Sequence, residues 1–144
     1  IYNYIVIKSY NFISCNPNTK PNLNSLTEEA TMEEALTLFL QQFQEEKSKQ
    51  GIVFFNRTKN LQALLDLELT AKRREKVIDT LSIQDYYKGP SADQVHVGLE
   101  YWEFGKEVRG QEIYIKISLG WPDGEVWCMS FHKAERNIQY PFKS

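Results

Sequence analysis

Residues 111–133, QEIYIKISLGWPDGEVWCMSFHK, are the part of the sequence that predicts structure most clearly. Apolar and polar residues alternate on both sides of a Pro-Asp-Gly turn at 122–124, and this period of two is typical of strands that bury one face. Pro-Asp-Gly favours a type I turn followed by a left-handed glycine, which closes a three-residue hairpin loop. We therefore expect two antiparallel strands, over residues 112–119 and 125–132.

The turn also predicts how the two strands pair. Counting outward from a Trp121–Glu125 pair gives these cross-strand neighbours: Ser118 with Cys128, Lys116 with Ser130, and Tyr114 with His132. The opposite face then collects only apolar side chains: Ile113, Ile115, Ile117, Trp127, Met129 and Phe131. A slip of one residue would mix the polar and apolar sets, so the pattern supports this register.

Helices are predicted upstream of the hairpin. We expect them to begin near Thr31, Thr58 and Thr70, with a buried strand at 52–55 after the first and a helical turn at 82–85 after the third. The first carries an apolar stripe between residues 32 and 43, and the second would turn three leucines inward: Leu61, Leu64 and Leu65. Residues 95–102 alternate like a further strand, followed by a loop at 104–110. The expected fold is α+β, with N-terminal helices packed on an antiparallel β-meander.

The composition fits one domain. The chain has 144 residues, 42% hydrophobic and 25% charged, and we expect the domain to span residues 29–144. Residues 1–28 are predicted to be a poorly packed extension or linker.

No apolar run is long enough to span a membrane and no signal-peptide pattern is present, which favours the cytoplasm. Cys15 and Cys128 are not spaced as a metal or redox motif, and Cys128 is expected to be a buried thiol.

The net charge of −2 argues mildly against a nucleic-acid partner, since such domains are often basic. The charge is unevenly distributed, however. Six of the 19 acidic residues lie within residues 25–50, beside only two lysines. The remaining acids and bases balance over residues 51–144, which leaves room for a local basic site there.

One polar cluster on the predicted hairpin could do chemistry. Directly opposed residues on antiparallel strands have Cβ atoms about 5 Å apart, so Tyr114 and His132 would be neighbours, with Lys116 one step along. These groups form a plausible acid/base cluster on the exposed face of a sheet. The alternative is that they are simply the solvated face of the sheet.

Several short segments resemble toxins of the MqsR family, which belong to bacterial type II toxin–antitoxin systems. The resemblance covers about residues 32–142 and lies in these segments: DYYKGP at 85–90, WEFGK at 102–106, IYIKI at 113–117, SFHKAE at 130–135 and YPF at 140–142. It implies a fold similar to that of RelE-type ribonucleases, cleavage of single-stranded mRNA without a metal or other cofactor, and a cognate antitoxin protein as partner.

The resemblance also implies which residues carry the reaction. The family's proposed catalytic positions fall on Lys88, Tyr114 and His132, although the last is a lysine in the best-known member. A glutamine of the family falls near Glu103, where this chain has an acid, and Glu103 is a candidate for contacting the substrate. On the predicted pairing Glu100, and not Glu103, shares the face of Tyr114.

Further residues are candidates for holding RNA. Lys106, Lys116 and Arg109 could contact phosphates, and Trp102 and Tyr87 could stack unpaired bases. The other histidine, His96, is expected to be structural. Lys72-Arg73-Arg74 could bind phosphate, but a basic run on a helix is usually a solvated face.

Two other functions remain open at the level of sequence. One is a non-catalytic RNA- or protein-binding module of the same fold. The other is a structural interaction domain that docks through the acidic helix at 32–46.

Overall fold

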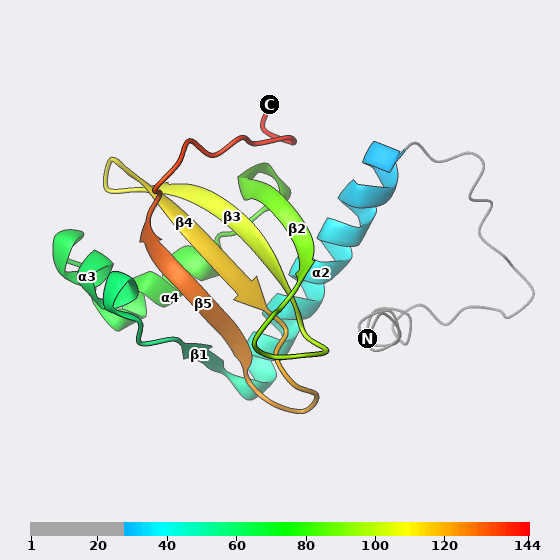
Figure 1. The fold of residues 1–144 in the computed structure, drawn as a ribbon, viewed down its shortest axis with the longest axis horizontal. Helices are drawn as coiled ribbons and strands as arrows, with labels where there is room; N and C mark the ends of the chain where they lie inside the picture. Colours follow the sequence, from blue (N-terminus) through cyan, green and yellow to red (C-terminus); the bar gives the residue numbers. More distant parts are fainter. Residues whose placement is uncertain (1–27) are drawn as a thin grey trace, which may run out of the picture.

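A five-stranded mixed sheet with helices on one side organises the part of the chain that the structure describes, residues 28–144 of a computed structural model (Figure 1). In chain order its elements are α2 (Glu28–Gln50), β1 (Ile52–Phe54), α3 (Thr58–Asp66), α4 (Ala71–Asp79), the 3-10 turn η2 (Ile83–Asp85), β2 (Tyr86–Ala92), β3 (Glu100–Val108), β4 (Gln111–Ser118) and β5 (Val126–Lys133). The expected α+β class is confirmed. The extension predicted for residues 1–28 lies, except for Glu28, outside the described residues.

The strand order is β1-β5-β4-β3-β2. Strands β3 to β5 form the expected antiparallel meander, and β2, which the sequence did not predict, extends it. At the other edge β1 pairs in parallel with β5. The prediction of a purely antiparallel sheet was therefore wrong at this edge. A parallel strand here gives partners to the outer backbone groups of β5, which an open edge would leave exposed.

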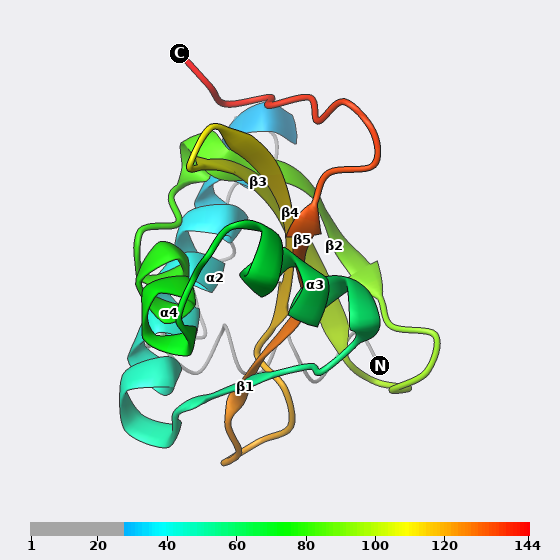
Figure 2. The same cartoon turned by 90° about the vertical axis from the view of Figure 1, so that its left-hand side faces the viewer.

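Two helices cover one face of the sheet. Figures 1 and 2 show α2 and α4 on the same side, whereas α3 lies beside β5 at the edge of the sheet. The apolar stripe predicted for the first helix is confirmed, because it is buried against the sheet at these positions: Leu36, Phe39, Leu40 and Phe43. No helix of the described chain covers the other face, which we call the open face. None of the described helices is long and apolar enough to cross a membrane.

The helix starts agree only in part with the sequence. Thr70 caps α4 as expected, since its side chain accepts a hydrogen bond from the Arg73 amide, and Ser82 with Asp85 forms the predicted capping box of η2. In contrast, α2 begins at Glu28, three residues before the predicted start at Thr31. The first turn of α3 receives no side-chain cap, because its N-cap position is Arg57.

Helix α3 is rotated relative to the prediction. Leu61 and Leu65 are 46% and 73% exposed, and the buried positions include Asn60 and Ala63 instead. Asn60 is the reason: its amide donates to the carbonyls of Phe55 and Met129, and its side-chain oxygen accepts from the Phe131 amide, all at 2.9–3.1 Å. Its side chain thus continues the pairing along the edge of β5 where β1 ends, and the two leucines face away.

The hairpin of β4 and β5 follows the predicted register over half its length. Tyr114 pairs with His132 and Lys116 with Ser130, as expected. A bulge then shifts the register, so that Ser118 pairs with Trp127 rather than with Cys128. The shift turns Cys128 into the core, where burial raises the pKa of its thiol to about 12. It also moves Trp127 out of the predicted apolar face and onto the open face.

Strand β3 lies later in the chain than predicted. Residues 93–99 form a connecting loop rather than a strand, and β3 runs through most of the predicted loop to Val108. The loop is held by Asp93, whose carboxylate accepts from the amides of Val95 and His96, both at 2.8 Å. Within β3 the buried side chains of Trp102 and Phe104 face the helices. Odd-numbered residues of this strand therefore lie on the open face.

Candidate active site

A pocket of about 270 Å³ opens at one end of the open face. Its wall is formed by side chains of four adjacent strands and of the segment that follows β5: Tyr87, Lys88, Glu103, Tyr114, His132, Arg136 and Ile138. Three of them, on β2, β4 and β5, are the residues that the family resemblance singles out as catalytic: Lys88, Tyr114 and His132. Residues far apart in the sequence thus meet around a single space.

Tyr114 is bound to an acid inside this pocket. Its hydroxyl donates to the Glu103 carboxylate at 2.5 Å, and Glu103 is only 7% exposed. Burial first, and then this carboxylate, raise the pKa of Tyr114 far above its ordinary value. The phenol therefore keeps its proton at neutral pH, so it can donate a hydrogen bond but cannot serve as a base.

The position of Glu103 corrects the sequence prediction. We expected Glu100 to share the face of Tyr114, but β3 pairs Gly105 with Tyr114 and Glu103 with Lys116. The prediction failed because it took residues 95–102 as one strand and so assigned even-numbered residues to the open face. Burial of Trp102 against the helices reverses that assignment.

His132 lies beside Tyr114, with ring centroids 5.3 Å apart. Its Nδ1 is 2.9 Å from the carbonyl oxygen of Lys133. A carbonyl oxygen can only accept, so we infer that Nδ1 carries the proton in the neutral ring. The lone pair of Nε2 is then the one that can take a proton from a bound molecule.

Two exposed cations stand at the mouth of the pocket. The Lys88 ammonium lies 5.0 Å from the ring centroid of Tyr87, and Arg136 follows β5 by three residues. Arg136 did not emerge from the sequence, although a basic residue shortly after a strand that ends in a candidate histidine is a signal that could have found it. Lys116 lies two residues along β4 from Tyr114. Its ammonium is 3.8 Å from the centroid of the Tyr101 ring, and burial lowers its pKa.

Three candidate substrate-binding residues are not part of this site. Lys106 faces the helices and bonds to Asp85 at 3.0 Å, since even-numbered residues of β3 lie on that side. Arg109, in the turn before β4, donates to the carbonyls of Leu67 and Glu68 after α3. Trp102 is 5% exposed and stacks on Phe39 at 4.8 Å, so its ring is not available to a base.

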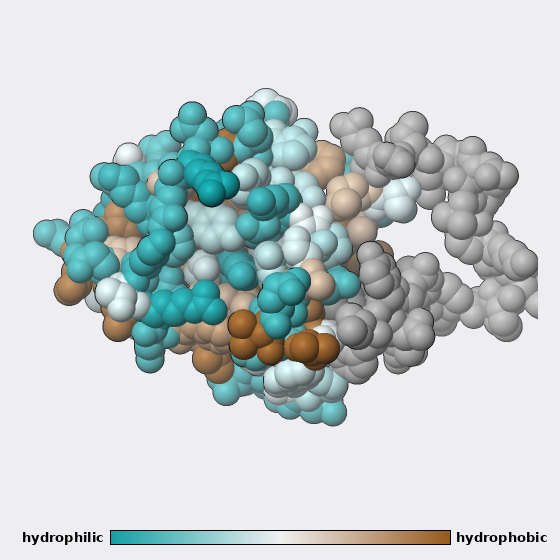
Figure 3. Space-filling view, viewed as in Figure 1, coloured by the Kyte–Doolittle hydropathy of each residue, from teal (hydrophilic) through white to brown (hydrophobic). Residues whose placement is uncertain are grey.

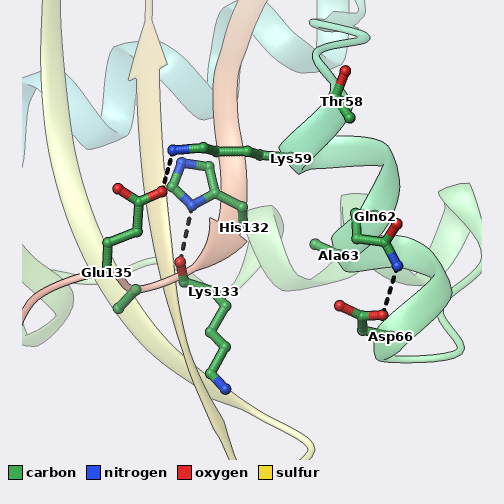
Figure 4. A pocket seen from close by; sticks show the side chains of 9 residues that line it. Thr58, Lys59, Gln62, Ala63, Asp66, His132, Lys133 and Glu135 are labelled. Atoms are coloured by element: carbon green, nitrogen blue, oxygen red, sulfur yellow. Dashed lines mark hydrogen bonds and ion pairs between the residues drawn. The ribbon is translucent and has the colours of Figure 1, made fainter.

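A second cavity, of about 350 Å³, lies on the other side of His132. Figure 4 shows it between α3 and the end of β5, with His132 near its inner wall and an ion pair of Lys59 with Glu135 across it. The hydrogen bond from Lys59 lowers the pKa of the Glu135 carboxyl. His132 therefore borders two hollows, one with a polar lining and one formed against α3.

Within residues 28–144, no three His, Cys, Asp or Glu side chains are grouped so that they could hold a metal ion. His96 contacts Asp93 at 3.2 Å in the loop before β3. No family model matches the chain, and comparisons with curated proteins and with solved structures found no match either. Function must therefore be inferred from the residues of the pocket and from the resemblance of short segments.

Proposed function

We propose that this protein is a metal-independent endoribonuclease that cleaves single-stranded mRNA. The observation that carries the proposal is the shared pocket of Lys88, Tyr114 and His132 at one end of the open face. It combines a group that can move a proton, a neutral hydrogen-bond donor and cations, which are the components needed to cleave RNA with its own 2′-hydroxyl as nucleophile.

The proposed reaction begins at the 2′-hydroxyl. Nε2 of His132 takes its proton, and the resulting oxygen attacks the adjacent phosphorus. The bond from phosphorus to the 5′-oxygen breaks, and the Lys88 ammonium gives that oxygen its proton. The products are a 2′,3′-cyclic phosphate and a 5′-hydroxyl end. A positioned proton-transfer group typically contributes about 10²–10⁴-fold to the rate.

The other pocket residues would hold the phosphate. Lys88 and Arg136 offer positive charge to its non-bridging oxygens, and the Tyr114 hydroxyl can turn from Glu103 to donate to one of them. Fixed donors aimed at developing charge lower a barrier because they need no rearrangement during the reaction.

The biological setting follows from the resemblance to MqsR toxins. We propose that the fold is of the RelE-like ribonuclease type and that the protein acts in the cytoplasm as the toxin of a type II pair. A cognate antitoxin would then be its protein partner. A small neighbouring gene whose product prevents growth arrest on induction would support this part of the proposal.

The test is RNA cleavage with a chelator present, followed by analysis of the product ends. We expect a 2′,3′-cyclic phosphate from the wild type and a loss of about 10²-fold or more in rate for His132→Ala. Lys76→Ala is the matched control, because Lys76 is exposed on α4, behind the sheet. If the wild type leaves RNA intact, or if His132→Ala cuts as fast as the control, the enzyme proposal fails.

A second candidate function is a non-catalytic RNA-binding module. Glu103 favours it, because an acid stands here where the family that the chain resembles has a glutamine, so the set of residues proposed for the reaction is not complete. Salt-sensitive binding of RNA without any cleavage would be the result expected of this alternative.

A further inference from the structure

A cluster of aromatic rings occupies the end of the open face opposite the pocket. Phe55, His96 and Trp127 lie with ring centroids 4.8–6.1 Å apart. We call these three side chains the aromatic platform. They come from the end of β1, the loop before β3 and the start of β5, and all three are only partly buried. Partly exposed rings that meet from three segments form a surface of their own.

The bulge in β5 creates this platform. Without it Trp127 would face the core, as the sequence predicted, and Cys128 would lie on the open face. The extra residue is Met129, whose carbonyl is bound by Asn60. The placement of Trp127 is therefore built into the pairing of the sheet.

Side chains of mixed character join the platform to the pocket. Tyr101 and Lys116 stand between them, with the ammonium over the ring. The pairs Tyr114–His132 and Ser118–Trp127 are four residues apart on β4, or about 13 Å at roughly 3.3 Å per residue. Figure 3 shows this face with residues of intermediate hydropathy near its centre, hydrophilic residues around most of them and strongly hydrophobic residues at its lower edge.

Positive charge accompanies the rings. The Arg57 guanidinium carbon lies 5.4 Å from the centroid of Phe55, and Lys116 is close enough to Arg57 that this charge adds to the larger effect of burial in lowering the pKa of Lys116. Two acids also lie near Lys116, and their negative charges act on its pKa in the opposite direction. Asp93 accepts hydrogen bonds from the loop amides and contacts His96, and Glu103 accepts one from Tyr114. The track from pocket to platform thus presents aromatic surface and cations together.

We infer that the aromatic platform binds bases of single-stranded RNA beyond the cleaved phosphate, at the other end of the open face. The inference rests on the proposed function and names where the rest of its substrate lies. Single-stranded RNA is read by unstacked bases that lie on aromatic side chains, and four-stranded RNA-binding sheets stack about two or three bases in this way. Cations between the rings suit the phosphates that link those bases.

The test measures binding of an RNA that cannot be cut, with 2′-O-methyl groups throughout. Phe55→Ala should weaken binding by about 5- to 150-fold, which corresponds to about 1–3 kcal/mol per stacked base at 1.4 kcal/mol per factor of ten. Leu65→Ala is the matched control, because it removes an exposed apolar side chain from α3. Phe55→Leu keeps the bulk but not the ring, and should weaken binding while leaving the unfolding midpoint close to that of the wild type.

A second arm removes the bases instead of the ring. An oligonucleotide that keeps its backbone but lacks the bases on one side of the central linkage should bind the wild type more weakly. The same change should make little difference to Phe55→Ala, because ring and base act as one contact. A duplex of the same sequence should bind more weakly than the single strand.

The platform inference is overturned if Phe55→Ala binds as well as Leu65→Ala, if loss of the bases has no effect on the wild type, or if the duplex binds equally well. Its failure is distinguishable from that of the enzyme proposal. If the wild type cleaves RNA but the Phe55 substitutions do not weaken RNA binding, only the platform inference is refuted. If removal of the ring and removal of the bases weaken RNA binding in a coupled way, but no RNA is cleaved, only the nuclease proposal is refuted.

Discussion

The two faces of the sheet follow different rules. The covered face is filled by residues that any strand with a period of two would bury, such as Ile113, Ile115 and Phe131. The open face carries the pocket and the platform, and its composition depends on one bulge and on the start of one strand. Alternation therefore shows that a face is polar, but not which polar groups meet on it.

The largest effect should come from breaking the covered face. Phe104 is fully buried, and Phe104→Ala should destabilise the protein by about 3–5 kcal/mol, because it removes a packed ring and leaves a cavity. Tyr101→Ala on the open face of the same strand should cost only about 1 kcal/mol, largely from the lost contact with Lys116. Chemical unfolding of both variants measures the difference. Equal losses would mean that the open face is packed as tightly as the core.

The same contrast explains what could be predicted from the sequence. The pairing of Tyr114 with His132 was predictable, because the turn and both strands are adjacent in the chain. The bulge was not, since the Asn60 side chain that bonds to β5 there comes from a helix far away in the sequence. Lys106 and Arg109 were candidates from the sequence because they are cations. Only the structure shows that Lys106 points toward the helices and that Arg109 bonds to carbonyls after α3.

The candidate site was predictable to a similar degree. Tyr114 and His132 were found from the predicted register of the hairpin. Lys88 was found only through the resemblance of short segments, because β2 brings it to the pair from a separate part of the chain. Arg136 lies beyond the last strand, where no periodicity applies. The platform was missed because Trp127 belongs to an apolar pattern that the bulge inverts.

A smaller effect on stability is expected at Asp93, in the loop that supports the platform. Burial raises the pKa of Asp93, but the hydrogen bonds from the His96 and Val95 amides outweigh it, so the folded-state pKa lies below the unfolded value of 3.8. A lowered pKa stabilises the fold above pH 3.8, and that stability is lost as the pH falls through the folded-state pKa.

We therefore expect the wild type to exceed Asp93→Asn in stability by on the order of 1 kcal/mol near neutral pH. The difference should shrink below about pH 4, since the lowered pKa of Asp93 determines where its charge is lost. Unfolding midpoints measured from neutral to acid pH provide the check. A difference that stays constant down to the acid limit would show that the charge of Asp93 contributes nothing.

The smallest effect concerns Glu103, which is hydrogen-bonded to Tyr114 in the pocket. Glu103→Gln keeps a hydrogen-bond acceptor for the phenol but removes the negative charge. Since that carboxylate helps to raise the pKa of Tyr114, the substitution should lower this pKa, which absorbance of the phenolate during an alkaline titration would report. It should also leave cleavage unchanged or raise it a few-fold, because less negative charge faces the incoming phosphate.

Glu107→Gln is the control, on the same strand and the same face but outside the pocket. A rate that falls about 100-fold for Glu103→Gln and not for Glu107→Gln would make the Glu103 carboxylate a required proton acceptor, at the magnitude expected of a general base. The proton would then leave the 2′-hydroxyl toward Glu103 and not toward His132. Both candidate bases lie beside Tyr114. The position at which β3 begins determines that Glu103 is one of them, and the alternation of apolar and polar residues does not reveal this.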